Sequence, residues 1–284
     1  MNLTVSLFFK ILKEKLLRVF AFVKSKTYYI LIGFFALLFV FAGVMLIREI
    51  SISNGEKQDF EDLISEFEIA EEYEEYEQPE NTESASSATQ APKKKKSTYK
   101  KVDVNAAIKK NPDCYGWLTV WGTVINYPVM HTPEDEQKYL HLNFNGKQSR
   151  SGVPFMDARC FENSDNIIIY GHNMLNGTMF HALKNYRNQG YWNKHKSITF
   201  ETANEKINYK VCAVVKVKST DNWYGFTIAG SEEYFNNRIK ETFGKAYYYT
   251  GITPKYGQKL LTLSTCFDGN HGDDRLIVIA VRQD

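Results

Sequence analysis

A cysteine and an arginine stand at the adjoining ends of two apolar segments near the C-terminus. Cys266 ends KLLTLSTC (259–266), Arg275 begins RLIVIAV (275–281), and the polar loop FDGNHGDD joins the two segments. Both segments have the β-branched content of strands, and antiparallel pairing would bring Cys266 and Arg275 together. A fixed cation favours the thiolate form of a cysteine, and a guanidinium can donate hydrogen bonds to charge that develops on a carbonyl oxygen. The pair indicates nucleophilic chemistry at Cys266, although a buried cysteine and a surface arginine fit the same pattern.

A histidine strengthens the nucleophilic interpretation. His172 follows the apolar run NIIIY (166–170) and a glycine, so the sequence predicts it at a strand exit. A histidine held there can protonate a leaving amine and later deprotonate an incoming one. His271, in the loop after Cys266, is the main rival for this role. The remaining histidines fit solvated, capping or packing positions: His131, His141, His181 and His195.

The other cysteines point to no further chemistry. Cys114, Cys160 and Cys212 form no CxxC pair with one another or with Cys266. This spacing argues against a zinc knuckle or a dense disulfide framework, so we expect free thiols or at most one or two bridges. No metal and no cofactor are predicted.

The segments that carry these residues belong to a strand-rich region from about residue 101 onward. WLTVWGTVINYPVM, NIIIYGH, SITFE and NYKVCAVVKVK are rich in β-branched and aromatic residues and are bounded by turn residues. Many short strands without long intervening helices predict a closed β-barrel or a sandwich. Two helices interrupt them, one over 104–110 and one from Ser231, the expected N-cap, to Phe243.

Residues 28–47, YYILIGFFALLFVFAGVMLI, carry no charge over the length that a membrane-spanning helix needs. Residues 1–27 hold six Lys or Arg and one acidic residue, whereas the region after Arg48 turns acidic. The positive-inside rule therefore predicts a plasma-membrane anchor with a cytoplasmic basic tail (1–27) and an exported C-terminal region. A cleaved signal peptide is the competing interpretation, but its apolar core is usually shorter.

Residues 48–100 predict a charged, largely disordered stalk. An acidic block, a small polar block and the basic run KKKKSTYKK follow one another, with too little apolar content to repay the entropy of ordering. Phe60, Leu63, Ile64 and Phe67 do recur at helical spacing, which indicates a short helix there. The net charge of the whole chain is only +2, which argues against a nucleic-acid partner.

These segments resemble the sortases, in particular class B. TLSTC (262–266) with Arg275 nine residues on, and YGHNM (170–174) upstream, carry the resemblance, together with NPDCYGWL, INYPVM and YLHLNFNGKQSRSGVPFMDARC. It covers essentially all of 101–284, although Cys160 stands where many class B members have asparagine. The resemblance implies a mainly β fold: a closed eight-stranded barrel with an N-terminal helix and a helix inserted before the cysteine strand.

The same resemblance implies a membrane-anchored cysteine transpeptidase whose catalytic residues are His172, Cys266 and Arg275. Such an enzyme cleaves the C-terminal sorting signal of secreted proteins, here of the NPxTx kind, through a Cys266 thioester. It then transfers the acyl group to an amine of a cell-wall precursor. The alternatives are an exported cell-wall cysteine hydrolase, which would use the same cysteine and histidine, and a non-catalytic surface binding domain.

Substrate recognition is predicted in the segment 221–243. DNWYGFTIAG places three aromatic residues in a glycine-flanked loop, where loops projected from a rigid scaffold commonly carry recognition groups. Tyr224 is the candidate for contact with the peptide, since its hydroxyl can also donate a hydrogen bond. Trp223 and Phe226 fit the core as well as a groove. Ser264 and Thr265, which precede Cys266, are further candidate substrate-binding residues.

Overall fold

The computed structural model describes residues 2–76, 94–268 and 272–283 and divides into two compact units, residues 1–55 and 56–284. The first unit is helical throughout its described residues and belongs to the long helix α1 (Asn2–Phe67). Within the part of the chain that the structure describes, one helical stretch, Lys26–Phe67, is long and apolar enough to cross a membrane. The predicted anchor, 28–47, lies inside it.

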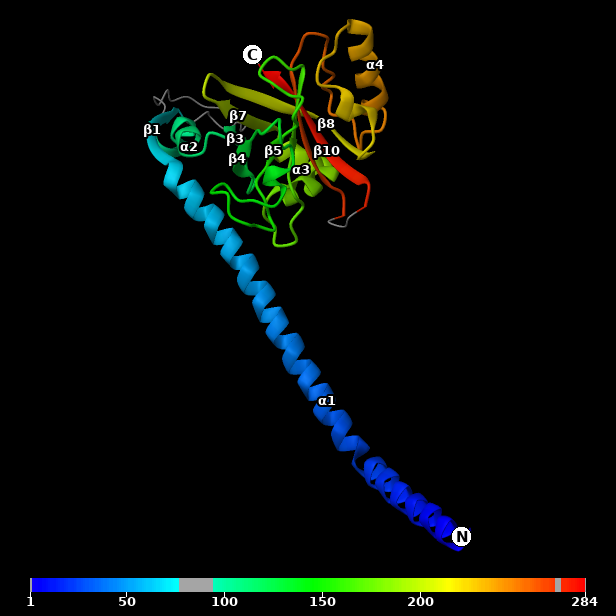
Figure 1. The fold of residues 1–284 in the computed structure, drawn as a ribbon. Helices are drawn as coiled ribbons and strands as arrows, with labels where there is room; N and C mark the ends of the chain where they lie inside the picture. Colours follow the sequence, from blue (N-terminus) through cyan, green and yellow to red (C-terminus); the bar gives the residue numbers. More distant parts are fainter. Residues whose placement is uncertain (1, 77–93, 269–271, 284) are drawn as a thin grey trace, which may run out of the picture. The chain divides into compact units, whose positions relative to one another are not determined.

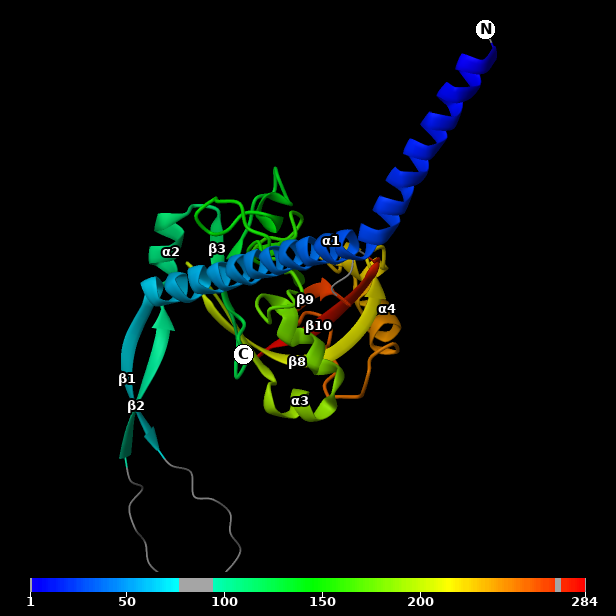
Figure 2. The same ribbon diagram turned by 90° about the horizontal axis from the view of Figure 1, so that it is seen from below.

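The second unit is built on a closed barrel of eight strands (Figures 1 and 2). Around the barrel the strands follow the order β10-β8-β7-β3-β4-β5-β6-β9. They are β3 (Cys114–Val120), β4 (Asn126–Met130), β5 (Phe155–Met156), β6 (Asn166–Tyr170), β7 (Ser197–Thr202), β8 (Lys206–Lys218), β9 (Leu260–Cys266) and β10 (Asp274–Gln283). The predicted mainly β, eight-stranded barrel is confirmed.

Two parallel pairings close the barrel: β4 with β5 and β6 with β9, while the other neighbours are antiparallel. Strands β9 and β10 are apolar along most of their length because both faces are covered, one by the barrel interior and one by neighbouring elements. One of these covering elements is the 3₁₀ segment η2 (Phe180–Arg187), which contacts β9 and β10. The longest strand, β8, bends across the barrel next to β10, and Figure 2 shows the two side by side.

The helices lie outside the barrel. α2 (Val104–Lys110) begins at Asp103, whose side chain accepts a hydrogen bond from the backbone of Ala106, and α4 (Glu232–Phe243) begins at Ser231 in the same way. Both agree with the predicted ranges. The shorter helical segments are η1 (Lys138–Leu140), α3 (Gln189–Lys194) and η3 (Asn222–Gly225). α4 lies between β8 and β9 in the chain and packs against η3 and β8, at one end of the barrel in Figure 1.

The region predicted to be a disordered stalk contains ordered structure in its described parts. The last turns of α1 pack on the barrel through Phe60, Leu63 and Phe67, all of which are buried. The ring of Phe67 meets Trp117 and Phe144 edge-on. The helical spacing of Phe60, Leu63 and Phe67 was visible in the sequence. The apolar partners that offset the entropy of ordering come from segments far along the chain. Residues 77–93 of the predicted stalk lie outside the described residues.

Two further strands follow this helix and form a ribbon of their own. β1 (Glu68–Tyr76) pairs antiparallel with β2 (Lys94–Val102). The register sets Glu74 opposite Lys96 and Glu75 opposite Lys95. The acidic and basic blocks, which suggested disorder when considered separately, are therefore paired as strands over 68–76 and 94–102.

Candidate active site

The hydrogen-bond register of β9 and β10 places Cys266 beside Arg275. Cys266 is the last residue of β9, and its partner in the antiparallel ladder is Arg275. Directly opposite residues on one face of such a pair have Cβ atoms about 5 Å apart. The sequence prediction that the adjoining strand ends bring the thiol and the guanidinium together is confirmed.

The other neighbour of β9 brings in His172. Strands β6 and β9 run parallel, with Tyr170 opposite Ser264, so the position two residues further on sets His172 level with Cys266. The backbone amide of Gly171 continues the ladder by donating to the carbonyl of Ser264 at 3.1 Å. A side chain at Gly171 would collide with the ring of Phe180, 2.7 Å from its Cβ, so this strand exit requires glycine.

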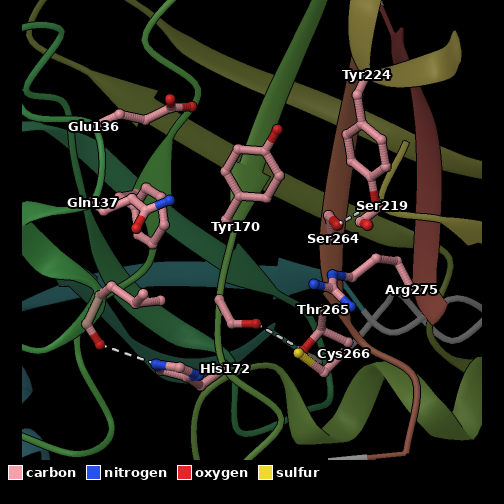
Figure 3. A pocket seen from close by; sticks show the side chains of 13 residues that line it. Glu136, Gln137, Tyr170, His172, Ser219, Tyr224, Ser264, Thr265, Cys266 and Arg275 are labelled. Carbon is pink, nitrogen blue, oxygen red and sulfur yellow. Dashed lines mark hydrogen bonds between the residues drawn. The ribbon is translucent and has the colours of Figure 1, made fainter. Parts of the chain in front are cut away.

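The three residues line one pocket of about 320 Å³ (Figure 3). Its other walls come from the segment before β5, from β5, β6 and β9, and from the segment around η3. They are Glu136, Gln137, Leu140, Phe155, Tyr170, Gly171, Ser219, Tyr224, Ser264 and Thr265. In Figure 3 Glu136 and Arg275 lie on opposite sides, so the pocket has an acidic and a basic end.

The ring of His172 is half-buried and held by the chain before β5. Its Nε2 donates to the carbonyl oxygen of Leu140 at 2.9 Å, because a carbonyl can only accept. This bond fixes the proton on Nε2 and leaves Nδ1 as the ring nitrogen open to exchange a proton. Burial lowers the pKa of His172. The ring of His141, stacked with its centroid 5.9 Å from that of His172, acts in the same direction. Among the described residues, no hydrogen bond joins this ring to the thiol of Cys266.

The ends of β6 and β9 are tied together on both sides of the thiol. Thr265 Oγ1 donates to the carbonyl of Gly171 at 2.7 Å, and Asn173 Nδ2 donates to the carbonyl of Cys266 at 3.0 Å. His181 Nδ1 in turn bonds to Asn173 Oδ1 at 2.8 Å. Arg275 is steadied by its own loop, since Nη1 donates to the carbonyls of Gly272 and Asp274.

The floor of the pocket consists of polar groups that satisfy one another. The Tyr224 hydroxyl and the Ser264 Oγ share a hydrogen bond of 2.8 Å, and burial raises the pKa of Tyr224 to about 12. The Tyr170 hydroxyl donates to Asp157 at 2.7 Å. Burial opposes ionisation of Asp157, but its hydrogen bonds to Arg159 outweigh this and hold its pKa below the usual range. Arg159 also donates to the carbonyl of Tyr224, which links this ion pair to η3.

The candidate substrate-binding residues therefore lie at the pocket but are largely covered. Tyr224, Ser264 and Thr265 line it with 8%, 1% and 3% of their surfaces exposed. Trp223 and Phe226 do not line it and are core residues; the indole of Trp223 donates to Thr262. The sequence left that alternative open, and the structure assigns both to the core.

The four cysteines are all free, but only Cys266 reaches the pocket. Cys114, Cys160 and Cys212 are buried, and burial raises their pKa values, to about 12 for Cys114 and about 11 for Cys160. A thiol held neutral is a poor nucleophile. The sequence left free thiols or one or two bridges open, and in this structure the thiols are free.

The four other histidines that the structure describes each contact another side chain. His195 is stacked on Tyr191, His131 meets the edge of Tyr115, and His181 bonds to Asn173. His141 stacks on His172 and lies beside the pocket without lining it. His271, the main rival, lies outside the described residues.

Comparison with known proteins agrees with the fold. The sortase domain family matches residues 118–283. The chain belongs to the sortase family. A sortase B of Staphylococcus aureus (strain NCTC 8325 / PS 47) is 32% identical over 175 residues, which are 61% of this chain and 71% of that protein. This sortase is therefore of class B and is a cysteine transpeptidase.

Solved sortase B structures agree in architecture. A Staphylococcus aureus sortase B-substrate complex has 31% identity and a TM-score of 0.59, over 64% of this chain and 84% of that one. Clostridium perfringens sortase B has 31% identity and a TM-score of 0.58, over 63% of this sortase and 99% of that chain.

Several pocket residues were not found from the sequence. Leu140 contributes a backbone carbonyl, which no side-chain pattern reveals, and Glu136 lies in a polar stretch that resembles any surface loop. Asn173 was part of the YGHNM motif but received no role. The DxR spacing of Asp157 and Arg159 was the one available signal for the ion pair beneath Tyr170 and Tyr224.

Proposed function

We propose that this sortase cleaves a sorting peptide at Cys266 and passes the acyl group to an amine, with His172 and Arg275 as its partners in catalysis. The observation that carries the proposal is the convergence of these three side chains on one pocket from three adjacent strands. The barrel holds them through backbone register, so little has to move before reaction.

The chemistry follows from the position of each group. The thiolate of Cys266 attacks the carbonyl carbon of the scissile bond, and the guanidinium of Arg275 stabilises the oxyanion that forms, a role worth on the order of 3 kcal/mol. Protonated His172 gives its proton to the departing amine as the carbon–nitrogen bond breaks, leaving a thioester on Cys266. The acceptor amine then attacks the thioester, His172 takes up its proton, and the thiolate leaves.

The acidic end of the pocket supports a sorting signal that carries a hydrogen-bond donor upstream of the cleaved bond. Glu136 and Gln137 are the polar groups on the side opposite Arg275 (Figure 3). An amide side chain, as in the asparagine of an NPxTx signal, offers two such donors. Tyr224 and Ser264 belong to the floor of the pocket on the side of Arg275 (Figure 3), and we assign the peptide contact there to them together with Thr265.

The partners on this proposal are secreted proteins with a C-terminal sorting signal and a cell-wall precursor that supplies the amine. We further propose that residues 28–47 anchor the enzyme in the plasma membrane, with residues 1–27 in the cytoplasm and the barrel outside. The uncharged run within α1 and the basic flank before it support this topology.

The test uses the full-length protein in detergent micelles with dye–quencher peptides that contain an Asn-Pro-x-Thr-x sequence, with and without triglycine. We expect cleavage, a ligated product when triglycine is present, and a Cys266 thioester detectable by mass spectrometry. Cys266→Ala should abolish turnover. The matched control is Cys160→Ala, which removes a buried thiol that does not line the pocket and should leave turnover intact.

Two results would contradict the proposal in different ways. Release of free acid with no ligated product at saturating triglycine would indicate the cysteine hydrolase. Equal turnover by Cys266→Ala and by the wild type would remove the nucleophile from this pocket.

A further inference from the structure

The loop that holds His172 is itself held from a distant part of the chain. Leu140 and His141 contact the imidazole and belong to the segment from Tyr139 to Val153, called here the 139–153 loop. Its first limb is 139–141 and its second limb is 149–153. Its second limb is bonded back to the first, since the amide of Ser149 donates to the carbonyl of His141 and that of Val153 to the carbonyl of Tyr139. The position of the second limb therefore determines that of the carbonyl that fixes the His172 tautomer.

The backbones of the two limbs are in close contact at Gly152. Its φ of +56° is in the left-handed region, and a Cβ there would lie 2.5 Å from the carbonyl oxygens of Tyr139 and Leu140. A shift of the second limb must therefore displace the carbonyl of Leu140.

Glu56 of α1 binds this second limb with both carboxylate oxygens. Oε1 accepts from the backbone amide of Arg150 at 2.5 Å and from Ser149 Oγ at 3.1 Å, and Oε2 accepts from Ser151 Oγ at 2.7 Å. Ser151 is buried, with 1% of its surface exposed. Hydrogen bonds to an ionised acceptor are stronger than neutral ones, and a buried hydroxyl that loses its partner pays for desolvation.

Glu56 is in turn fixed by the helix that carries it. One and three turns further along α1, Phe60 and Phe67 are buried against the barrel, and Phe60 packs edge-on against Tyr127. The end of the helix is joined to the start of α2 by the amide of Asp103, which donates to the carbonyl of Phe67 at 2.8 Å. The carboxylate therefore approaches the loop from a rigid support.

We propose that Glu56 is a positioning residue for His172, acting through the 139–153 loop and the carbonyl of Leu140. The inference rests on the proposed role of His172 as the acid and base. Without Glu56 the second limb loses three hydrogen bonds, the carbonyl of Leu140 loosens, and the ring of His172 no longer keeps one tautomer and one orientation. The negative charge of Glu56 also acts on the ring directly. Burial lowers the pKa of His172, and Glu56 opposes that effect.

The experiment compares Glu56→Ala with Glu66→Ala in the full-length protein. Glu66 lies on the same helix, and its carboxylate pairs with Lys110 of α2 at 2.6 Å instead of with the second limb of the loop, so it controls for the loss of a helical carboxylate. In Glu56→Ala, kcat should fall about 10- to 100-fold because small misplacements of a catalytic group cost rates of this order. KM for the peptide should change by less than about twofold, since Glu56 does not line the peptide pocket and Leu140 is the one residue of the 139–153 loop that does. Glu66→Ala should match the wild type.

Two further readouts separate positioning from a general loss of stability. Glu56→Gln, which keeps an acceptor for the amide of Arg150, should recover part of kcat. The rate at which diethyl pyrocarbonate modifies His172, followed by mass spectrometry, should rise in Glu56→Ala, whereas alkylation of Cys266 by iodoacetamide should stay unchanged. Assays run well below the melting temperature of each variant. Should Glu56→Ala fail to fold, Ser151→Ala removes one of the three hydrogen bonds and carries the same test.

The proposal is overturned if folded Glu56→Ala retains the kcat of the wild type, or if His172 is modified at the same rate in both proteins. Absence of peptide turnover by the wild type would instead count against the proposed function. In that case the modification rate of His172 still decides whether Glu56 positions the ring.

Discussion

Two regions of this sortase position its reactive groups by different means. Cys266 and Arg275 are direct partners in the β9–β10 ladder, so backbone hydrogen bonds fix their relation. His172 stands level with them, but its ring is oriented by the 139–153 loop, which depends on the end of α1. A ladder tolerates change in the side chains around it because every residue contributes to its register. A chain of side-chain contacts is broken when any one member is lost. Single substitutions should therefore affect the two regions differently.

The largest expected effect is on the free energy of unfolding, and it tests whether the end of α1, which supports the 139–153 loop, is attached to the barrel. Phe67→Ala removes a ring that packs against Trp117 and Phe144, and it should lower the free energy of unfolding by about 3–5 kcal/mol. Chemical denaturation of the full-length protein would measure this, with the exposed Tyr249→Ala as control. If the helix end were an unattached stalk, Phe67→Ala would leave the unfolding curve unchanged.

The second prediction tests the ladder itself. Arg275→Lys keeps the charge and the strand but replaces the planar fork with an ammonium group, which cannot reproduce its fixed donors. We expect kcat/KM to fall by about 10²-fold or more, as for other lost oxyanion donors, with little change in melting temperature. A comparable rate in Arg275→Lys would mean that charge alone suffices and that the alignment with Cys266 matters less than the ladder suggests.

The contrast also explains which features could be predicted from the sequence. Cys266, Arg275 and His172 stand at strand ends, where apolar runs and turn residues give local signals, and the pairing of neighbouring strands follows from a few topological rules. The helices α2 and α4 gave equally local signals and were predicted at the observed positions, with the cap at Ser231 predicted and the cap at Asp103 found only in the structure.

What the sequence did not give is set by contacts between distant segments. β5 has only two residues, Phe155 and Met156, and is a strand because β4 and β6 flank it. The binding of Glu56 to the loop depends on partners more than ninety positions away. No periodicity or motif reports such a contact, since a glutamate on an acidic helix has the same local pattern whether or not it has a buried partner.

The third prediction concerns Tyr224 and Ser264 in the floor of the pocket. Tyr224→Phe removes the hydroxyl that bonds to Ser264 and should lower stability by about 1 kcal/mol, the usual net value of one hydrogen bond. If this part of the floor contacts the peptide, KM should rise while kcat and the alkylation of Cys266 stay unchanged. Tyr234→Phe, on the exposed side of α4, is the matched control. A drop in stability with no change in KM would assign Tyr224 to packing, and Ser264 and Thr265 would then be tested next.

The smallest effect is a dependence of stability on pH that originates in the loop-held histidine. Burial lowers the pKa of His172 below its ordinary value of 6.5, so as pH falls below 6.5 the unfolded chain takes up a proton that the folded chain does not. The unfolded state then binds more protons, and stability decreases with falling pH between 6.5 and the lowered pKa. His131 and His181, whose pKa values burial also lowers, contribute in the same window. In His172→Gln the decrease in unfolding free energy from pH 7 to pH 5 should therefore be smaller than in the wild type but still present. Chemical denaturation at several pH values would measure both slopes. Equal slopes would show that the ring does not lose hydration on folding, and that the 139–153 loop encloses it less tightly than its contacts with Leu140 and His141 indicate.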